Sequence, residues 1–177
     1  ANEFMTKTLR DSCPSKFIGK NLRFEIRLVD IQSKEEVDKE MTELIKRRLK
    51  EEYELINETV TNNYPDSKAD NHGMYIILTK KGNGNIVKNG NNVAINYVAK
   101  FLNGEILTNT YKWKEPFSFV VGKQQVIEGL ERGVINQTVG SKLTIIVPSK
   151  LGYGVKGNHK IPSCTPILFE LEIMNTK

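Results

Sequence analysis

Residues 115–134 read Glu-Pro-Phe-Ser-Phe-Val-Val-Gly-Lys-Gln-Gln-Val-Ile-Glu-Gly-Leu-Glu-Arg-Gly-Val. The first half is rich in aromatic and β-branched residues and predicts a strand over residues 117–121. The second half predicts one short helix over about residues 125–133. This helix is the only interruption expected in a half of the chain that otherwise reads as strands.

Strands are predicted on both sides of this stretch. Apolar and polar residues alternate over residues 93–102, and the Asn103-Gly104 pair that follows is a strong hairpin signal. Further strands are predicted at residues 74–79, 143–147 and 167–174. Many short strands with a single helix indicate an α+β domain in which the helix covers one face of an antiparallel sheet.

Upstream of the strands, residues 34–61 predict a long amphipathic helix. Ser33 and Glu36 form a capping box at its start, and the Tyr64-Pro65 pair ends it. The helix is followed by residues 64–73, which are polar and breaker-rich and predict a linker. The apolar stripe of the helix consists of Met41, Ile45, Leu49, Ile56 and Val60.

This stripe has two interpretations. It packs on its own chain, or it forms the seam of a dimer. We favour packing on the same chain, because Arg48 and Glu52 interrupt one edge of the stripe and strict heptads do not persist.

Composition places the chain among globular proteins. Of its 177 residues, 26 are basic and 21 acidic, and the interspersed charges leave a net charge of +5. We expect no nucleic-acid partner, because the sequence has no basic stripe interleaved with aromatic residues. The sequence has no run of 18 apolar residues, and its N-terminus lacks the pattern of a secretory signal. Since the chain starts at Ala1 without Met, export stays open.

Residues that could hold a metal or react covalently are sparse. Cys13 and Cys164 have no CxxC or Cys/His spacing, and we expect ordinary thiols rather than a disulfide. His72 and His159 have no neighbouring carboxylates or cysteines. Residues 82–85 predict a turn, because no phosphate-binding pattern or helix start follows them. We therefore expect no metal site and no cofactor.

Several blocks of the sequence occur in the order and spacing of a known family. They are residues 93–98 with the Asn103-Gly104 hairpin, residues 115–134, residues 148–154 and the Ile161-Pro162 pair. Together they resemble the FKBP family of peptidyl-prolyl cis/trans isomerases over about residues 72–177. The preceding helix is similar to the macrophage infectivity potentiator subgroup of bacteria. That similarity favours the bacterial cell envelope or periplasm over the cytoplasm.

The resemblance implies a sheet half-wrapped around the short helix, with a substrate proline held between them. Five residues would have catalytic roles: Tyr97, Phe117, Ile127, Tyr153 and Phe169. Ile127 would offer its backbone N–H to a substrate carbonyl, and Tyr153 would donate its hydroxyl from the rim. The substrate-binding positions would be Leu107, Thr108, Gln125, Val126, Leu130 and Ile161.

These residue types suit the chemistry, because rotation about an X-Pro bond needs no acid, base or metal. An aromatic cleft that removes water from the amide favours the twisted state, in which charge separation is lost. Three positions depart from the family pattern. Leu130 stands where a Trp is usual, Leu107 where Phe is frequent and Thr108 where Asp is usual. We therefore expect reduced or altered activity and weak binding of macrolide inhibitors.

The resemblance divides the chain into three parts. Residues 1–33 are interpreted as the tail of a second, degenerate FKBP-like copy, because residues 22–28 parallel residues 167–173. Chance likeness between alternating strands is the other explanation. Residues 34–71 are the helix and linker, and residues 72–177 are the isomerase domain. A homodimer through the N-terminal region is a further expectation.

Two functions are compatible with these residues. The first is an isomerase that assists protein folding by binding proline-containing polypeptides. The second is a non-catalytic chaperone or partner-binding module, which Leu130 and Thr108 would permit. We expect the isomerase.

Overall fold

The computed structural model describes residues 33–177. The interpretation of residues 1–33 as a partial FKBP-like copy, and the N-terminal dimer contact, fall almost wholly outside this range. Cys13 also lies outside it, whereas Cys164 is a buried, free thiol. Residues 38–177 form one compact unit, which carries all of the predicted site.

The long helix α2 spans Lys34–Asn63, and it starts where the sequence predicts and ends two residues later. The predicted capping box is present at its start. The Ser33 hydroxyl oxygen accepts the Glu36 N–H at 3.2 Å, and the Glu36 carboxylate accepts the Ser33 N–H at 2.8 Å. This backbone hydrogen bond, followed by one from the Ser33 hydroxyl, lowers the pKa of Glu36. No helix of the described chain is long and apolar enough to span a membrane.

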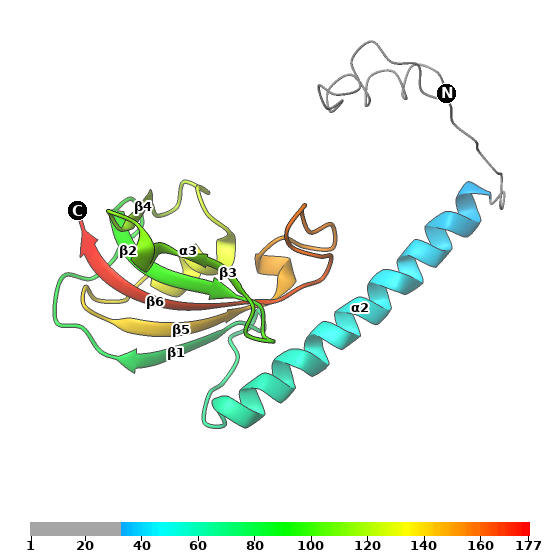
Figure 1. Cartoon of the computed structure of the whole chain (residues 1–177), viewed down its shortest axis with the longest axis horizontal. Coiled ribbons are helices and arrows are strands. Elements are labelled where there is room, and N and C mark those ends of the chain that lie inside the picture. The colour runs from blue at the N-terminus through cyan, green and yellow to red at the C-terminus, as the bar shows by residue number, and fades with distance from the viewer. Residues whose placement is uncertain (1–32) are drawn as a thin grey trace, which may run out of the picture. The chain divides into compact units, whose positions relative to one another are not determined.

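Six antiparallel strands form one sheet (Figure 1). They are β1 (Tyr75–Lys80), β2 (Asn92–Lys100), β3 (Ile106–Asn109), β4 (Phe117–Val120), β5 (Lys142–Val147) and β6 (Ile167–Thr176). The order is β1-β5-β6-β2-β3, and β4 also pairs with β2. The predicted α+β class is therefore confirmed, and each predicted strand lies within two residues of its observed bounds.

The short helix α3 spans Glu128–Val134 and approaches β5 closely. Two glycines one turn apart make this approach possible. A Cβ on Gly129 would lie 2.2 Å from Cγ1 of Val147, and one on Gly133 would lie 2.2 Å from Cδ1 of Ile145. A side chain at Gly129 would push α3 away from the sheet, because it meets three atoms of the short Val147 side chain, whereas at Gly133 the nearest atom is the end of the flexible Ile145 side chain.

At β5 and at the start of β6 the sheet is covered on both faces, and alternate residues of these strands point to opposite sides. On one side, Ile145 of β5 and Phe169 of β6 belong to the main core, which also includes residues of α3. On the other side, Ile146 and Leu168 pack against Ile56 and Val60 of α2 in a second cluster. We call this second group the outer cluster. It comprises Ile56, Val60, Ile146 and Leu168, with Tyr64, Tyr75 and Leu102 partly buried against it.

The predicted packing of α2 on its own chain is confirmed for its C-terminal half. Met41 and Leu49 of the predicted stripe are exposed. Glu52 is a correction to the sequence analysis: it does not interrupt the packed face but lies buried within it, because its carboxylate is hydrogen-bonded to Ser149.

An aromatic cluster as the candidate active site

Three rings predicted as catalytic meet on one face of the sheet. Strand pairing explains why: Ile95 of β2 lies opposite Phe117 of β4, and Ala99 lies opposite Phe169 of β6. Tyr97 is midway between Ile95 and Ala99, so its side chain shares their face. The Tyr97 ring centroid lies 5.8 Å from that of Phe117 and 5.7 Å from that of Phe169. The interplanar angles of 82° and 56° are those of edge-to-face and tilted contacts.

The backbone of Tyr97 is held by the buried side chain of Thr110, which begins the 3₁₀ helix η2 (Thr110–Lys112). The Tyr97 N–H donates to the Thr110 hydroxyl oxygen at 2.8 Å, and that hydroxyl donates back to the Tyr97 carbonyl at 3.3 Å. Along the edge of β2 that faces Thr110, β4 pairs with residues 92–95 and β3 pairs with residues 98–100, so Tyr97 lies between the two paired segments. Thr110 therefore supplies the hydrogen bond that no neighbouring strand provides for Tyr97.

Tyr153 lies on the loop that follows the 3₁₀ helix η3 (Ser149–Leu151), near enough to Tyr97 for the two phenols to interact electrostatically. Burial raises the pKa of Tyr97, and the charge of an ionised Tyr153 raises it further. Tyr153 is 38% exposed, as expected for a residue at a rim. Within the described chain, neither phenol hydroxyl has a hydrogen-bond partner. Both are therefore available to a ligand.

Ile127 supplies a free backbone donor at the start of α3. It is the N-cap residue, with φ −61° and ψ 146°, and its carbonyl accepts from Leu130 and Glu131. Its own N–H has no acceptor among residues 33–177. Its side chain reaches the Tyr153 loop, because a Cβ placed on Gly152 would lie 3.9 Å from Ile127 Cδ1.

Four of the predicted binding residues pack in the same core as Tyr97, Phe117, Ile127 and Phe169. Leu107 and Val126 are half-buried against the main core, whereas Leu130 and Ile161 are buried within it. Thr108 pairs with Ala99 and Ile106 with Lys100, so the intervening Leu107 is an unpaired bulge residue. A bulge re-aims a side chain, which accounts for the inward position of Leu107.

Gln125 has a structural contact. Its side-chain oxygen accepts the N–H of Val120 at 2.8 Å, and this bond closes the turn between β4 and α3. Glu131 supports the same turn, because its carboxylate accepts from Gly122 and Gln124. A substrate contact for Gln125 therefore stays a prediction.

The sequence analysis missed Trp113. This residue follows η2, is 50% exposed, and places its ring edge-on to Phe117 with the centroids 6.3 Å apart. The backbone N–H of Trp113 donates to the Thr110 carbonyl at 2.9 Å, and the Asn109 side chain caps the same turn by accepting the Tyr111 N–H. The only sequence signal was the position of the single Trp of the chain between two lysines, in a segment with no strand or helix pattern.

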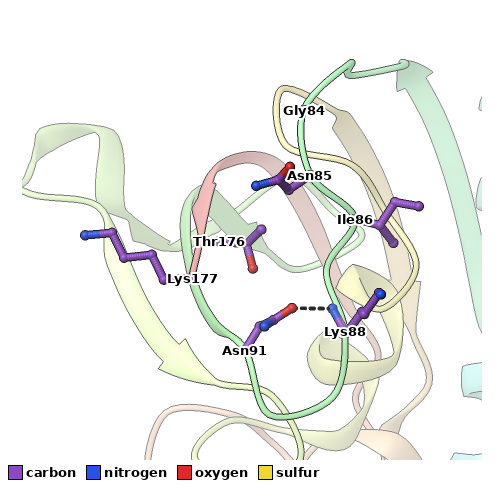
Figure 2. Close-up of a pocket in the computed structure, with 7 residues that line it drawn as sticks. All are labelled: Gly84, Asn85, Ile86, Lys88, Asn91, Thr176 and Lys177. Atoms are coloured by element: carbon purple, nitrogen blue, oxygen red, sulfur yellow. Dashed lines mark hydrogen bonds between the residues drawn. The ribbon is translucent and has the colours of Figure 1, made fainter.

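A separate hollow of about 530 Å³ contains none of the predicted site residues (Figure 2). It lies between the end of β6 and the loop before β2, and the Lys88 N–H donates to Asn91 at 2.8 Å on its wall. Thr176 is buried there, and its hydroxyl has no partner within the described residues. The lining residues are Gly84, Asn85, Ile86, Lys88, Asn91, Thr176 and Lys177.

An antiparallel sheet, a short helix on one face and a partly exposed ring cluster beside that helix define an α+β domain with an aromatic binding face. The family model for FKBP-type peptidyl-prolyl cis-trans isomerases matches residues 84–174. This chain belongs to that family.

The curated relatives differ in how much of their length this chain covers. It is 37% identical to FK506-binding protein 4 of Emericella nidulans over 105 residues. These residues are 59% of this chain and 22% of that protein. It is 33% identical to FK506-binding protein 1 of Dictyostelium discoideum over 106 residues. These residues are 59% of this chain and 99% of that protein. The chain therefore spans about a fifth of the first relative and nearly all of the second.

Solved structures share the fold. FkpA from Escherichia coli superposes with a TM-score of 0.68 at 20% identity, over 100% of this chain and 82% of that one. A peptidyl-prolyl cis-trans isomerase from Pseudomonas syringae superposes with a TM-score of 0.65 at 24% identity, over 75% of this chain and 95% of that one. At these identities the likeness establishes the arrangement of helices and strands.

Proposed function

We propose that this chain is a peptidyl-prolyl cis/trans isomerase that assists protein folding. Family membership supports the activity. The observation that carries the proposal is the meeting of the Tyr97, Phe117 and Phe169 rings. Ile127, which packs against the same core, has an unused backbone N–H, and Tyr153, on the loop that the Ile127 side chain reaches, has an unused hydroxyl. This arrangement offers an apolar surface for a prolyl ring together with two donors for the polar groups around it.

The proposed mechanism is differential binding of the twisted amide. Rotation about an X-Pro bond breaks amide resonance against a barrier of roughly 18 to 20 kcal/mol. The three rings exclude water from the amide, which destabilises the planar, charge-separated form more than the twisted one. The Ile127 N–H and the Tyr153 hydroxyl hold substrate carbonyls in register. Each step consists of binding and rotation, and no proton is transferred.

The proposed substrate is a proline-containing segment of another polypeptide. Leu107, Val126, Leu130 and Ile161 extend the apolar surroundings of the rings, and Gln125 and Thr108 lie at the edge. We propose weak macrolide binding, because Thr108 and Leu130 lack the carboxylate and the broad ring that are usual at these positions. Dimerisation through the N-terminal region stays a prediction.

A non-catalytic binding module is the second candidate. The half-exposed ring of Trp113 favours it, because this ring extends the aromatic surface outward from Phe117. Such a surface would bind a polypeptide segment without altering the rate of amide rotation. The two candidates differ only in whether bound substrate isomerises faster.

The test is NMR exchange on a proline tetrapeptide with micromolar protein. We expect acceleration over the uncatalysed rate and a loss of most of it in Tyr153→Phe. Tyr111→Phe is the matched control, because Tyr111 is an exposed tyrosine on η2 that has no ring contact with the cluster. Folded protein that binds the peptide without accelerating exchange would establish the binding module instead.

A further inference from the structure

The buried carboxylate of Glu52 on α2 is the starting point. Glu52 is 7% exposed, and one carboxylate oxygen accepts the Ser149 N–H while the other accepts the Ser149 hydroxyl at 2.7 Å. Among the ion pairs of residues 33–177, none includes Glu52. A buried carboxylate is strongly unfavourable unless hydrogen bonds replace its hydration. These two bonds to one residue are therefore the reason Glu52 is tolerated inside the fold.

Ser149 in turn holds the backbone on both sides of Tyr153. The Ser149 carbonyl accepts the N–H of Gly152 at 2.8 Å and the N–H of Gly154 at 2.8 Å. These glycines flank Tyr153, and Gly154 adopts a φ of +67°, a conformation that glycine allows. The Ser149 carbonyl thus holds the N-terminal side of the Tyr153 loop, while the Tyr153 carbonyl accepts from Gly157 at 3.1 Å and the Gly154 carbonyl from Cys164 at 3.0 Å on the other side.

Ser149 therefore makes two sets of hydrogen bonds, one through its N–H and hydroxyl and the other through its carbonyl. Its N–H and hydroxyl are held by Glu52, which restrains its φ and χ1 angles. With those angles restrained, the Cα–C bond of Ser149 is held in place, and the direction of its carbonyl then depends on ψ, which the 3₁₀ helix η3 sets. The Glu52 carboxylate therefore holds in place the residue whose carbonyl accepts from both Gly152 and Gly154.

The packing of α2 places Glu52 next to Ser149. Glu52, Ile56 and Val60 are four residues apart, so they share one helix face, and they are the buried residues of α2. Ile56 and Val60 contact Ile146 and Leu168 in the outer cluster, on the opposite side of the sheet from the rings. The long helix α2 thus reaches the loop of the site through its buried face.

We propose that Glu52 is a positioning residue for Tyr153, acting through Ser149. The expected effect of Glu52 on the order of the Tyr153 loop is argued from the hydrogen bonds of Ser149 alone. The consequence for catalysis rests on the proposed function, in which Tyr153 contacts the substrate.

Amide hydrogen exchange measured by NMR tests the positioning directly in the full chain. Hydrogen bonds to a charged group contribute enough free energy for their loss to be visible in exchange rates. Glu52→Ala is therefore expected to speed exchange of the Gly152 and Gly154 amides at least about tenfold. Exchange of β5 amides is expected to stay unchanged. Glu58→Ala is the matched control, because it removes an exposed carboxylate from the same helix. Unchanged exchange at both glycines would overturn the proposal, as would equal acceleration in β5. If Glu52→Ala does not fold, Glu52→Gln keeps the volume, and the same comparison applies with a smaller expected acceleration.

A double-mutant cycle on kcat/KM tests the catalytic consequence. Glu52→Ala and Tyr153→Ala are each expected to lower kcat/KM, and the double variant is expected to fall no further than Tyr153→Ala alone. A purely structural role for Glu52 would instead make the two losses multiply, which would overturn the catalytic part. If the unmodified chain shows no isomerisation, the proposed function fails, while the exchange experiment still decides whether Glu52 orders the loop.

Discussion

The ring of Trp113 stands edge-on to the ring of Phe117, with centroids 6.3 Å apart and planes at 74°. Phe117 is half-buried and touches Tyr97 on its other side, whereas Trp113 is half exposed. The aromatic cluster therefore continues from the interior of the sheet to the surface. A polypeptide whose proline lies on Tyr97 and Phe117 would bring a neighbouring residue near Trp113.

Trp113 is the only tryptophan of the chain, so its fluorescence reports on this site alone. We expect a proline-containing peptide to change its emission with a saturable dependence on concentration. The same peptide with Ala in place of Pro is expected to produce a much smaller change. Saturable binding seen by calorimetry with no change in emission would show that the ligand lies away from Trp113.

Thr110→Val is expected to destabilise the fold and lower kcat/KM. The substitution keeps the shape but removes the hydroxyl that accepts the Tyr97 N–H. An unsatisfied buried donor costs about 1 to 3 kcal/mol, measurable by urea unfolding. Thr110→Ser retains the hydroxyl and is expected to recover most of the stability and the rate. A loss in Thr110→Ser with none in Thr110→Val would show that the methyl group, rather than the hydrogen bond, is what matters.

Gly129→Ala and Gly133→Ala are each expected to lower the free energy of unfolding by about 1 to 3 kcal/mol, because overpacking displaces α3 from β5. The added methyl group would meet Val147 or Ile145 at 2.2 Å. Ala normally favours a helix over Gly, so the expected sign is opposite to that of helix propensity. Arg132→Ala is the control on the same helix, and it removes only an exposed ion pair with Glu128. Stabilisation by either glycine substitution would mean that α3 shifts without cost.

The raised pKa of Tyr97 predicts a loss of stability at alkaline pH. The causes are burial first and the Tyr153 charge second. Because the unfolded chain releases this proton at a lower pH, near 10, the contribution is fully present below about pH 10. It is lost as pH rises through the higher folded pKa. The free energy of unfolding should therefore fall less steeply above pH 10 in Tyr97→Phe than in the exposed control Tyr53→Phe. Identical slopes would contradict the shift.

The elements of this fold were predictable because each has a local signal. The capping box at Ser33 and the hairpin at Asn103-Gly104 depend on residues a few positions apart. Alternation likewise predicted the strand that became β2, whereas Phe117 and Phe169 were assigned to the site by the family resemblance. The predicted bounds of α3 were the least accurate, because Gln125 belongs to the turn that it closes with Val120.

The contacts of the site were harder to predict, because they join distant positions. Glu52 and Ser149 are 97 residues apart, and a carboxylate on an apolar helix face ordinarily indicates solvent. Trp113 likewise lies in a segment without periodicity, and its position follows from η2 and from Phe117.

The sequence by itself determined the α+β class, the order of the strands along the chain and the apolar and aromatic residue types available to the site. These properties follow from short-range preferences of backbone and side chains. Only the tertiary structure decided that Tyr97, Phe117 and Phe169 meet, that α2 buries Glu52 against Ser149, and that Trp113 extends the cluster. The physical reason is that sheet pairing and helix packing set distances between residues whose separation in sequence carries no local signal.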